Sequence, residues 1–222
     1  MRPLLDALQY GATTLGLALT PEQLGRLLDY LDLLQKWGKV YNLTALRQPA
    51  DMLTHHLLDS LAVVLPLKRR LAGTSLANRA RLLDVGSGAG LPGVVLAVCC
   101  PDIDVSCVDT VAKKAAFIQQ VALSLQLSNL RGIHARVENL PDRYDVVVSR
   151  AFASLGDFTQ LSAKSLAPSG IWLAMKGKLP DAEMAVLSVS VQVFHVEQIT
   201  VPGLNAERCL VWMRHQAGGH RR

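Results

Sequence analysis

The residues best suited to ligand chemistry lie where an apolar run meets a glycine-rich segment. The run Leu82 to Val85 contains Asp84, and Gly86-Ser-Gly-Ala-Gly90 follows it directly. Glycines adopt backbone angles that other residues avoid, and they leave no Cβ between the main chain and a bound molecule. The N–H groups at the start of the following helix then face an anionic group. We therefore expect ligand contacts at Gly86 and Gly88.

A second acid ends the next apolar run. Asp109 closes the segment Val105-Ser-Cys-Val-Asp109, where a carboxylate can accept hydrogen bonds from both hydroxyls of a ribose. The two segments together predict a nucleoside pocket at the carboxyl ends of neighbouring strands.

The identity of that nucleoside rests on the loop and on Asp84. Gly88, Gly90 and Gly93 also match the dinucleotide pattern Gly-x-Gly-x-x-Gly, but a lone match is weak, and here Gly86 is the glycine that follows the strand. The carboxylate of Asp84 disfavours a pyrophosphate and favours a cation. S-adenosyl-L-methionine carries a sulfonium and an amino group, and it is the cofactor we expect. A nicotinamide-dependent oxidoreductase and a glycine turn without a ligand stay open as alternatives.

From residue 81 onward apolar strands alternate with helical segments, as a parallel sheet with crossover helices requires. The final two strands follow one another without a helix, which predicts an antiparallel hairpin at the sheet edge. We predict an α/β fold of the Rossmann-like, class I S-adenosylmethionine-dependent methyltransferase type, whose seven-stranded sheet is mostly parallel with the last strand antiparallel. Helices are expected near 94–99, 112–125, 155–166 and 181–190, and strands at 82–85, 105–109, 130–134, 145–149, 171–175, 194–200 and 210–213.

Residues 1–67 are predicted to form an N-terminal helical extension. Thr20-Pro-Glu-Gln23 supplies a helix cap and a first-turn proline, and a further helix is expected from about residue 49 to 65, after a break at 37–44. His56 and Asp59 lie one turn apart on it, so they either interact or jointly face a substrate, and the sequence leaves their roles open. The remaining parts are a basic linker at 68–80, the methyltransferase domain at 81–216 and a basic tail at 217–222.

Composition limits the class of protein. The chain has 222 residues, half of them hydrophobic, which suits one α/β domain with an accessory segment. No apolar run is long enough to span a membrane, and Asp6 near the start disfavours a secretory signal, so we expect a cytoplasmic protein. The four cysteines lack metal-ligand spacing, which predicts reduced thiols and no metal site.

The net charge of +5 favours a polyanionic partner such as RNA. Basic side chains outside the pocket are candidates for phosphate contacts. A plain alternative is that they are solvated surface charges. The candidates are Arg69, Arg70, Lys113, Lys176, Arg221 and Arg222.

The segment after the fourth strand narrows the chemistry. It reads Ser149-Arg-Ala-Phe152, whereas enzymes that methylate exocyclic amino groups usually carry Asn/Asp-Pro-Pro-aromatic there. Methylation of a pyrimidine carbon needs a thiolate, and no cysteine lies in the loops that follow the strands. An acceptor with an available lone pair, such as guanine N7, remains. Because such a site needs positioning more than proton transfer, we assign no acid–base residue.

At this point the chain resembles the RsmG (GidB) family of bacterial 16S ribosomal RNA guanine-N7 methyltransferases, over nearly its whole length. Five segments in the family's order carry the resemblance. They are Asn42-Leu-Thr44, His56-Leu-Leu-Asp-Ser-Leu61, Asp84-Val-Gly-Ser-Gly-Ala-Gly-Leu-Pro-Gly93, Ser149-Arg-Ala-Phe-Ala-Ser-Leu155 and Ala174-Met-Lys-Gly177.

The resemblance implies a site and a substrate. It implies that Gly86 and Leu91 line the cofactor pocket, that Val137 and Glu138 flank the adenine, and that Arg150 completes the site. The implied reaction methylates guanine 527 in the 530 loop of 16S rRNA, within the small ribosomal subunit or an assembly intermediate.

Two departures from the family pattern are Gly38 in place of asparagine and Ala112 in place of glycine. Methylation of a protein or a small molecule is the main alternative function, and a non-catalytic RNA-binding module is a further one.

Overall fold

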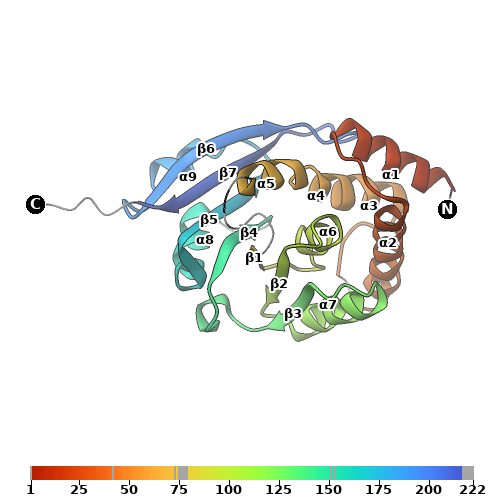
Figure 1. Cartoon of the computed structure of the whole chain (residues 1–222), viewed down its shortest axis with the longest axis horizontal. Coiled ribbons are helices and arrows are strands. Elements are labelled where there is room, and N and C mark those ends of the chain that lie inside the picture. Colours follow the sequence, from red (N-terminus) through yellow and green to blue (C-terminus); the bar gives the residue numbers. More distant parts are fainter. Residues whose placement is uncertain are drawn as a thin grey trace, which may run out of the picture.

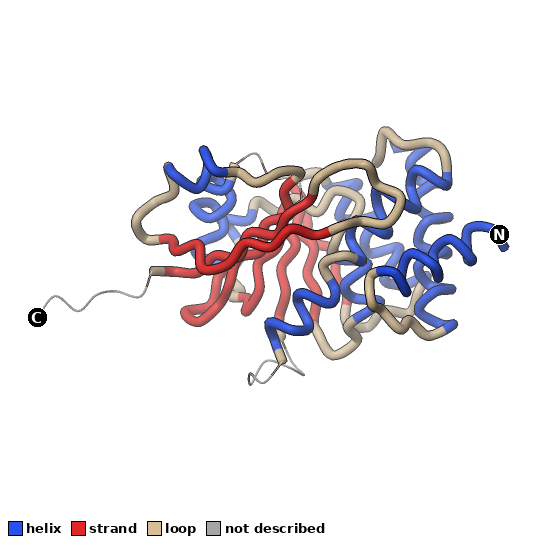
Figure 2. The backbone as a smooth tube through the Cα atoms, turned by 90° about the horizontal axis from the view of Figure 1, so that it is seen from above, coloured by secondary structure: helices blue, strands red, loops and turns tan. Residues whose placement is uncertain are grey.

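The computed structural model describes residues 2–41, 43–72, 74, 80–150, 152 and 154–216. One central sheet carries helices on both faces, and the N-terminal helices gather beside it (Figure 2). In the described residues no helix is both long and apolar enough to cross a membrane.

The N-terminal extension is helical, as predicted. The capping box at the start of α2 is present, because Thr20 Oγ1 accepts from the Gln23 N–H at 3.1 Å and Gln23 Oε1 accepts from the Thr20 N–H at 3.0 Å. The helices are α1 (Arg2–Thr14), α2 (Pro21–Tyr41), α3 (Pro49–Met52), the π-helical turn η1 (Leu53–Leu58), α4 (Asp59–Leu61) and α5 (Val64–Leu71).

The predicted break at 37–44 is wrong over most of its length, because α2 continues to Tyr41. Trp37 packs against Phe117 of the sheet domain with ring centroids 5.4 Å apart, and this contact holds the last turns of α2 in place. The helix expected at 49–65 is instead interrupted by the π-helical turn and by a turn at 62–63.

The boundary between extension and linker also differs from the prediction. Lys68, Arg69 and Arg70 belong to the last turn of α5, not to a linker. Leu67 and Leu71 lie four residues apart on one buried face, so the helix continues past residue 67. Residues 73 and 75–79 of the linker and the whole tail at 217–222 lie outside the described residues.

The described residues form a seven-stranded sheet with the strand order β3-β2-β1-β4-β5-β7-β6. The number of strands and the α/β fold class agree with the prediction. The strand β7 runs antiparallel to both of its neighbours, β5 and β6. The predicted antiparallel hairpin of the last two strands at the sheet edge is therefore confirmed. The strands are β1 (Arg81–Val85), β2 (Asp104–Asp109), β3 (Leu130–His134), β4 (Tyr144–Ser149), β5 (Leu166–Lys176), β6 (Val191–Ile199) and β7 (Arg208–His215).

Side chains alternate between two cores on either face of the sheet. Leu82, Val146 and Trp212 face the core shared with α6, α7 and the N-terminal helices. Leu83 and Val147 face a smaller core covered by α8. Figure 1 shows α6 and α7 beside β1 to β3, with α8 and α9 near β5. The connecting helices are α6 (Gly93–Cys99), α7 (Ala112–Ser124), η2 (Val137–Asn139), α8 (Leu155–Ser162), η3 (Ala163–Ser165) and α9 (Asp181–Ala185), the last ending five residues before its predicted end.

Candidate active site

The glycine loop after β1 adopts the conformation that its sequence predicts. Gly86, Gly88 and Gly90 all have positive φ angles of 65°, 60° and 92°. A Cβ on Gly90 would collide with Val94, whereas a Cβ on Gly88 would have no atom within 4 Å. The loop therefore packs tightly on its helix side and presents bare backbone beside open space at Gly88.

Asp84 lies beneath this loop, and its predicted role in attracting a cation is not supported by its position. The side chain is completely buried, and Oδ2 accepts a hydrogen bond from the Gly93 N–H at 2.8 Å. Burial raises the pKa of Asp84 to about 7, so the carboxyl is partly protonated at neutral pH. It ties the start of α6 to β1 and does not line the cavity described below.

Asp109 ends β2 and faces the loop. Its Oδ2 accepts from the Gly88 N–H at 3.0 Å, its Oδ1 accepts from the Val111 N–H at 2.9 Å, and the Lys114 Nζ lies 3.6 Å from Oδ2. Each carboxylate oxygen can accept a second hydrogen bond. The main chain therefore orients Asp109 and leaves capacity for the hydroxyls of a ligand.

A cavity of about 450 Å³ opens at the carboxyl ends of β1, β2, β3 and β4. In wound sheets this edge, at the point where the strand order reverses, is where ligands bind. The volume is within the range of small-molecule sites. Its lining residues are Val85, Gly86, Val108, Asp109, Thr110, Val111, Lys114, Ala135, Arg136, Val137, Glu138, Phe152 and Leu161.

Glu138 supplies the second carboxylate of this cavity. Its own backbone N–H and Arg136, whose Nη2 lies 3.2 Å from Oε1, lower the pKa of Glu138, so it is an ionised acceptor. The cavity thus has two acids at one end and the aromatic ring of Phe152 on its wall.

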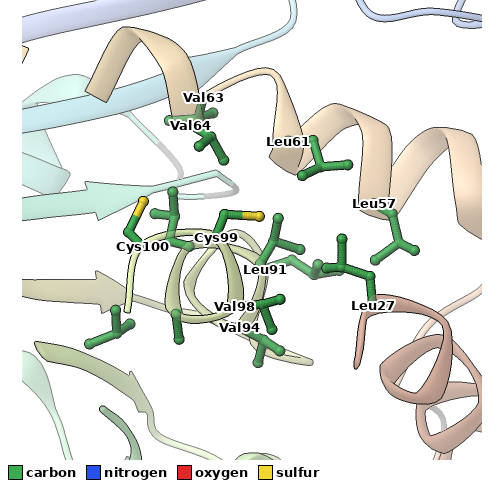
Figure 3. Packing of buried hydrophobic residues seen from close by; sticks show 14 of the residues in the cluster. Leu27, Leu57, Leu61, Val63, Val64, Leu91, Val94, Val98, Cys99 and Cys100 are labelled. Atoms are coloured by element: carbon green, nitrogen blue, oxygen red, sulfur yellow. The ribbon is translucent and has the colours of Figure 1, made fainter. Parts of the chain in front are cut away.

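Four of the seven cofactor-binding residues expected from the sequence line this cavity: Gly86, Asp109, Val137 and Glu138. Gly88 is joined to it through Asp109. Leu91 is 4% exposed and lies in the core, where Figure 3 places it close to Leu27 and the side chains of α6.

Arg150 stands apart from the lining. Its Nη1 donates to the His55 carbonyl oxygen at 3.0 Å and lies 3.3 Å from Asp59 Oδ2. His56 and Asp59 do not contact each other through their side chains: His56 Nε2 hydrogen-bonds Thr44 Oγ1 at 2.7 Å, whereas Asp59 binds arginines. Burial, followed by the charge of Arg150, lowers the pKa of His56 to about 4.

Sequence reasoning missed Phe152 and Lys114 as lining residues. Phe152 ends the segment Ser149-Arg-Ala-Phe152 that follows the fourth strand, and Lys114 follows the candidate Lys113. Their positions soon after a strand were the signal that could have identified them.

The basic residues expected to contact RNA are distributed over several elements. Arg69 forms an ion pair with Glu197 at 3.4 Å, and the guanidinium of Arg70 stacks on Phe194. Lys113 is exposed at the start of α7, one residue before Lys114, which lines the cavity. Lys176 is bound to Glu183 through contacts of 2.9 and 3.0 Å. Arg221 and Arg222 lie outside the described residues.

A second polar hollow of the described residues lies on the other edge of the sheet. A hollow of about 250 Å³ beside Arg81, Arg131 and Tyr144 lies at the amino ends of the strands, opposite the ligand-binding edge. No group of three or more potential metal ligands occurs among the described residues.

This chain is similar to solved structures and to relatives in sequence. The ribosomal protein L11 methylase of Lactobacillus delbrueckii subsp. bulgaricus superposes with a TM-score of 0.51 over 70% of this chain and 80% of its own, at 14% identity. With the strand order and the glycine loop, this likeness defines a Rossmann-like, S-adenosylmethionine-dependent methyltransferase fold.

The sequence comparisons are more specific. The model of the GidB family, described as rRNA small subunit methyltransferase G, matches residues 23–211. The ribosomal RNA small subunit methyltransferase G of Albidiferax ferrireducens is 63% identical over 98% of this chain and 100% of its own length, and that of Acidovorax ebreus is 66% identical over 94% of each. The chain belongs to the rRNA small subunit methyltransferase G family.

Proposed function

We propose that this protein transfers the methyl group of S-adenosyl-L-methionine to N7 of a guanine in 16S rRNA, guanine 527 of the 530 loop. The observation that supports it best is the cavity at the carboxyl edge, whose glycine loop and two acids suit an adenosine, in a chain of the methyltransferase G family.

The donor set of the cavity fits S-adenosylmethionine. The space beside Gly88 leaves room for a ligand against the backbone, and Asp109 and Glu138 can accept hydrogen bonds from ribose and adenine. Val137, buried behind Glu138, supplies an apolar surface for the adenine.

A nicotinamide dinucleotide fits less well. Its pyrophosphate needs free N–H groups at the start of the helix after the loop. Here the Gly93 N–H, the first of α6, is taken by Asp84 Oδ2 at 2.8 Å, and the Val94 N–H donates to the Gly90 carbonyl at 2.7 Å. This arrangement disfavours the oxidoreductase alternative.

The bound cofactor supplies an electrophilic methyl group on a sulfonium. The protein's contribution is placement: Asp109 and Glu138 hold the adenosine, and the glycine loop lets the main chain approach. Phe152 lines the cavity and supplies an apolar wall to the bound cofactor. Guanine N7 carries a lone pair and no proton, so no side chain needs to act as a general base.

RNA binding is proposed to depend on basic side chains outside the cavity. The proposed phosphate contacts are Lys113, which precedes the lining residue Lys114, and Arg69, Arg70, Arg221 and Arg222. Lys176 is proposed to act with less effect, because Glu183 neutralises it. Removing a contributing charge raises the KM for RNA and flattens its dependence on salt, while the Kd for cofactor stays unchanged.

The test is methyl transfer from labelled S-adenosylmethionine to small ribosomal subunits that lack the modification, with large subunits as the control. The proposal expects label in 16S rRNA of the small subunit and none in the large subunit. Label in ribosomal protein or in a small-molecule fraction, with none in RNA, would support the alternative methyltransferase function instead.

A further inference from the structure

The carboxylate of Asp59 joins the helical extension to two arginines of the sheet domain. The side chain is 4% exposed. Its Oδ1 accepts from Arg208 Nε at 2.8 Å, and its Oδ2 pairs with Arg150 Nη1 at 3.3 Å. Arg150 follows the carboxyl end of β4, and Arg208 begins β7. Both carboxylate oxygens of Asp59 therefore bind arginines at the sheet edge where the cavity opens.

The cluster is not electrically balanced. One carboxylate meets two guanidiniums, whose side chains are 23% and 21% exposed for Arg150 and Arg208. The second guanidinium satisfies the second carboxylate oxygen and leaves the cluster with one more positive than negative charge. The surplus positive charge is available to an anion that approaches this edge.

The donors of Arg150 are only partly used. Nη1 binds Asp59 and the His55 carbonyl, and no described residue accepts from Nε or Nη2. Arginine has five N–H donors, so three of those on Arg150 lack an acceptor among the residues that the structure describes. The neighbouring Ser149 donates from Oγ to the Val85 carbonyl at 2.9 Å, directly before Gly86, which places Arg150 beside the glycine loop.

The charge of Arg150 reaches the underside of that loop. This charge lowers the pKa of Asp84, against the larger effect of burial. It also lowers the pKa of His56, where it adds to the larger effect of burial. The two acids that suit the adenosine, Asp109 and Glu138, lie on the lining segments after β2 and β3, whereas Arg150 follows β4. The end of the ligand nearest Arg150 is then the end opposite the adenine.

We propose that Asp59 is a positioning residue: it fixes the guanidinium of Arg150 so that Nε and Nη2 receive the carboxylate of the amino-acid end of S-adenosylmethionine. This inference rests on the proposed function for the identity of the cofactor. It gives the helical extension a direct part in cofactor binding, through a residue 91 positions from its partner in the chain.

The test compares two ligands that differ only in that carboxylate: S-adenosylmethionine and decarboxylated S-adenosylmethionine. Asp59→Asn is expected to raise the Kd for S-adenosylmethionine about tenfold, which is about 1.4 kcal/mol, and to leave the Kd for the decarboxylated ligand within about twofold. Arg150→Gln gives the same selective loss, and the double variant binds no more weakly than Arg150→Gln, because the two residues act through one contact. Asp102→Asn, on an exposed turn, is the matched control and changes neither Kd.

Circular dichroism and melting temperature establish that each variant is folded. If Asp59→Asn does not fold, Asp59→Glu keeps the buried charge and displaces the arginine, and a smaller loss confined to S-adenosylmethionine is expected. Equal weakening of both ligands, or of neither, overturns the proposal. The proposal is also overturned if Asp59→Asn leaves the Kd for S-adenosylmethionine unchanged and raises the KM for RNA. That result would assign the free N–H donors of Arg150 to an RNA phosphate. A wild-type protein that binds neither ligand would refute the proposed function instead.

Discussion

The N–H group of Gly88 donates to Oδ2 of Asp109 over 3.0 Å, and this bond ties the glycine loop after β1 to the acid at the end of β2. The same carboxylate accepts from the Val111 N–H at 2.9 Å. Asp109 thus shapes the pocket and offers hydrogen-bonding capacity to a ligand. A single substitution there removes both contributions.

Asp109→Ala is therefore expected to weaken S-adenosylmethionine binding by ~1–3 kcal/mol, because buried donors lose a charged acceptor. Isothermal titration calorimetry measures the change, with the exposed Asp102→Ala as the control. An unchanged Kd in Asp109→Ala would remove this residue from the site.

Gly93 and Gly25 form a matched pair of helical glycines. A Cβ on Gly93 would collide with Cys107 Sγ and lie 2.9 Å from Asp84 Oδ2, whereas a Cβ on Gly25 has no atom within 4 Å. Gly93→Ala should lower the free energy of unfolding by ~1–3 kcal/mol through overpacking. Gly25→Ala should raise it by ~0.5–1 kcal/mol, since alanine favours the helix. Denaturant unfolding measures both, and equal stabilisation of the two variants would contradict the packing described beneath the loop.

The pKa of His56 is lowered from 6.5 to about 4, so the unfolded chain binds a proton at a pH where the folded chain does not. The stability that depends on neutral His56 is present above about pH 6.5 and is lost as the pH falls toward 4. His56→Gln should remove this loss, which is of the order of 2–3 kcal/mol at pH 4.

Asp84 acts with the opposite sign, because its raised pKa makes the folded state less stable as the pH rises from about 4 to 7. The difference between wild type and His56→Gln at each pH isolates the histidine. Parallel stability curves for the two proteins between pH 4 and 7 would show that His56 titrates normally in the folded state.

The methyl-transfer step should be nearly independent of pH wherever the protein is folded, because guanine N7 has no proton to lose. Neither His56, with a pKa near 4, nor the buried Asp84 lies in the cavity as a base. Single-turnover rates against pH check this. A limb near pH 6–7 that disappears in a histidine variant would indicate general-base catalysis and a different acceptor atom.

Local sequence signals predicted the sheet and placed Gly86 and Asp109 at the edge where the cavity opens. Asp109 ends one short apolar run and Gly86 follows another, so both positions at the sheet edge could be predicted from the chain alone. The seven strands were found because each is bounded by turns or crossover helices.

The remaining features depend on contacts that spacing does not encode. The prediction for Asp84 rests on an ionised carboxylate at the strand end, but packing of α6 against β1 buries the side chain and raises its pKa to about 7. Leu91 was expected to line the cofactor pocket only because of the family resemblance, and its side chain lies in the core. The bonds from Asp59 to Arg150 and Arg208 span 91 and 149 positions, and only the folded chain brings them together.

The most direct test of the central claim is the position and atom of the methyl group added by this protein. Small subunits lacking the modification are incubated with S-adenosylmethionine, and the 16S rRNA is digested and analysed by mass spectrometry, with cleavage at 7-methylguanine to locate the site. One methyl group at N7 of guanine 527 is the predicted result, and its yield is expected to fall with Asp109→Ala at limiting cofactor. A methyl group on another atom or nucleotide, or none at all with bound S-adenosylmethionine, would contradict the account.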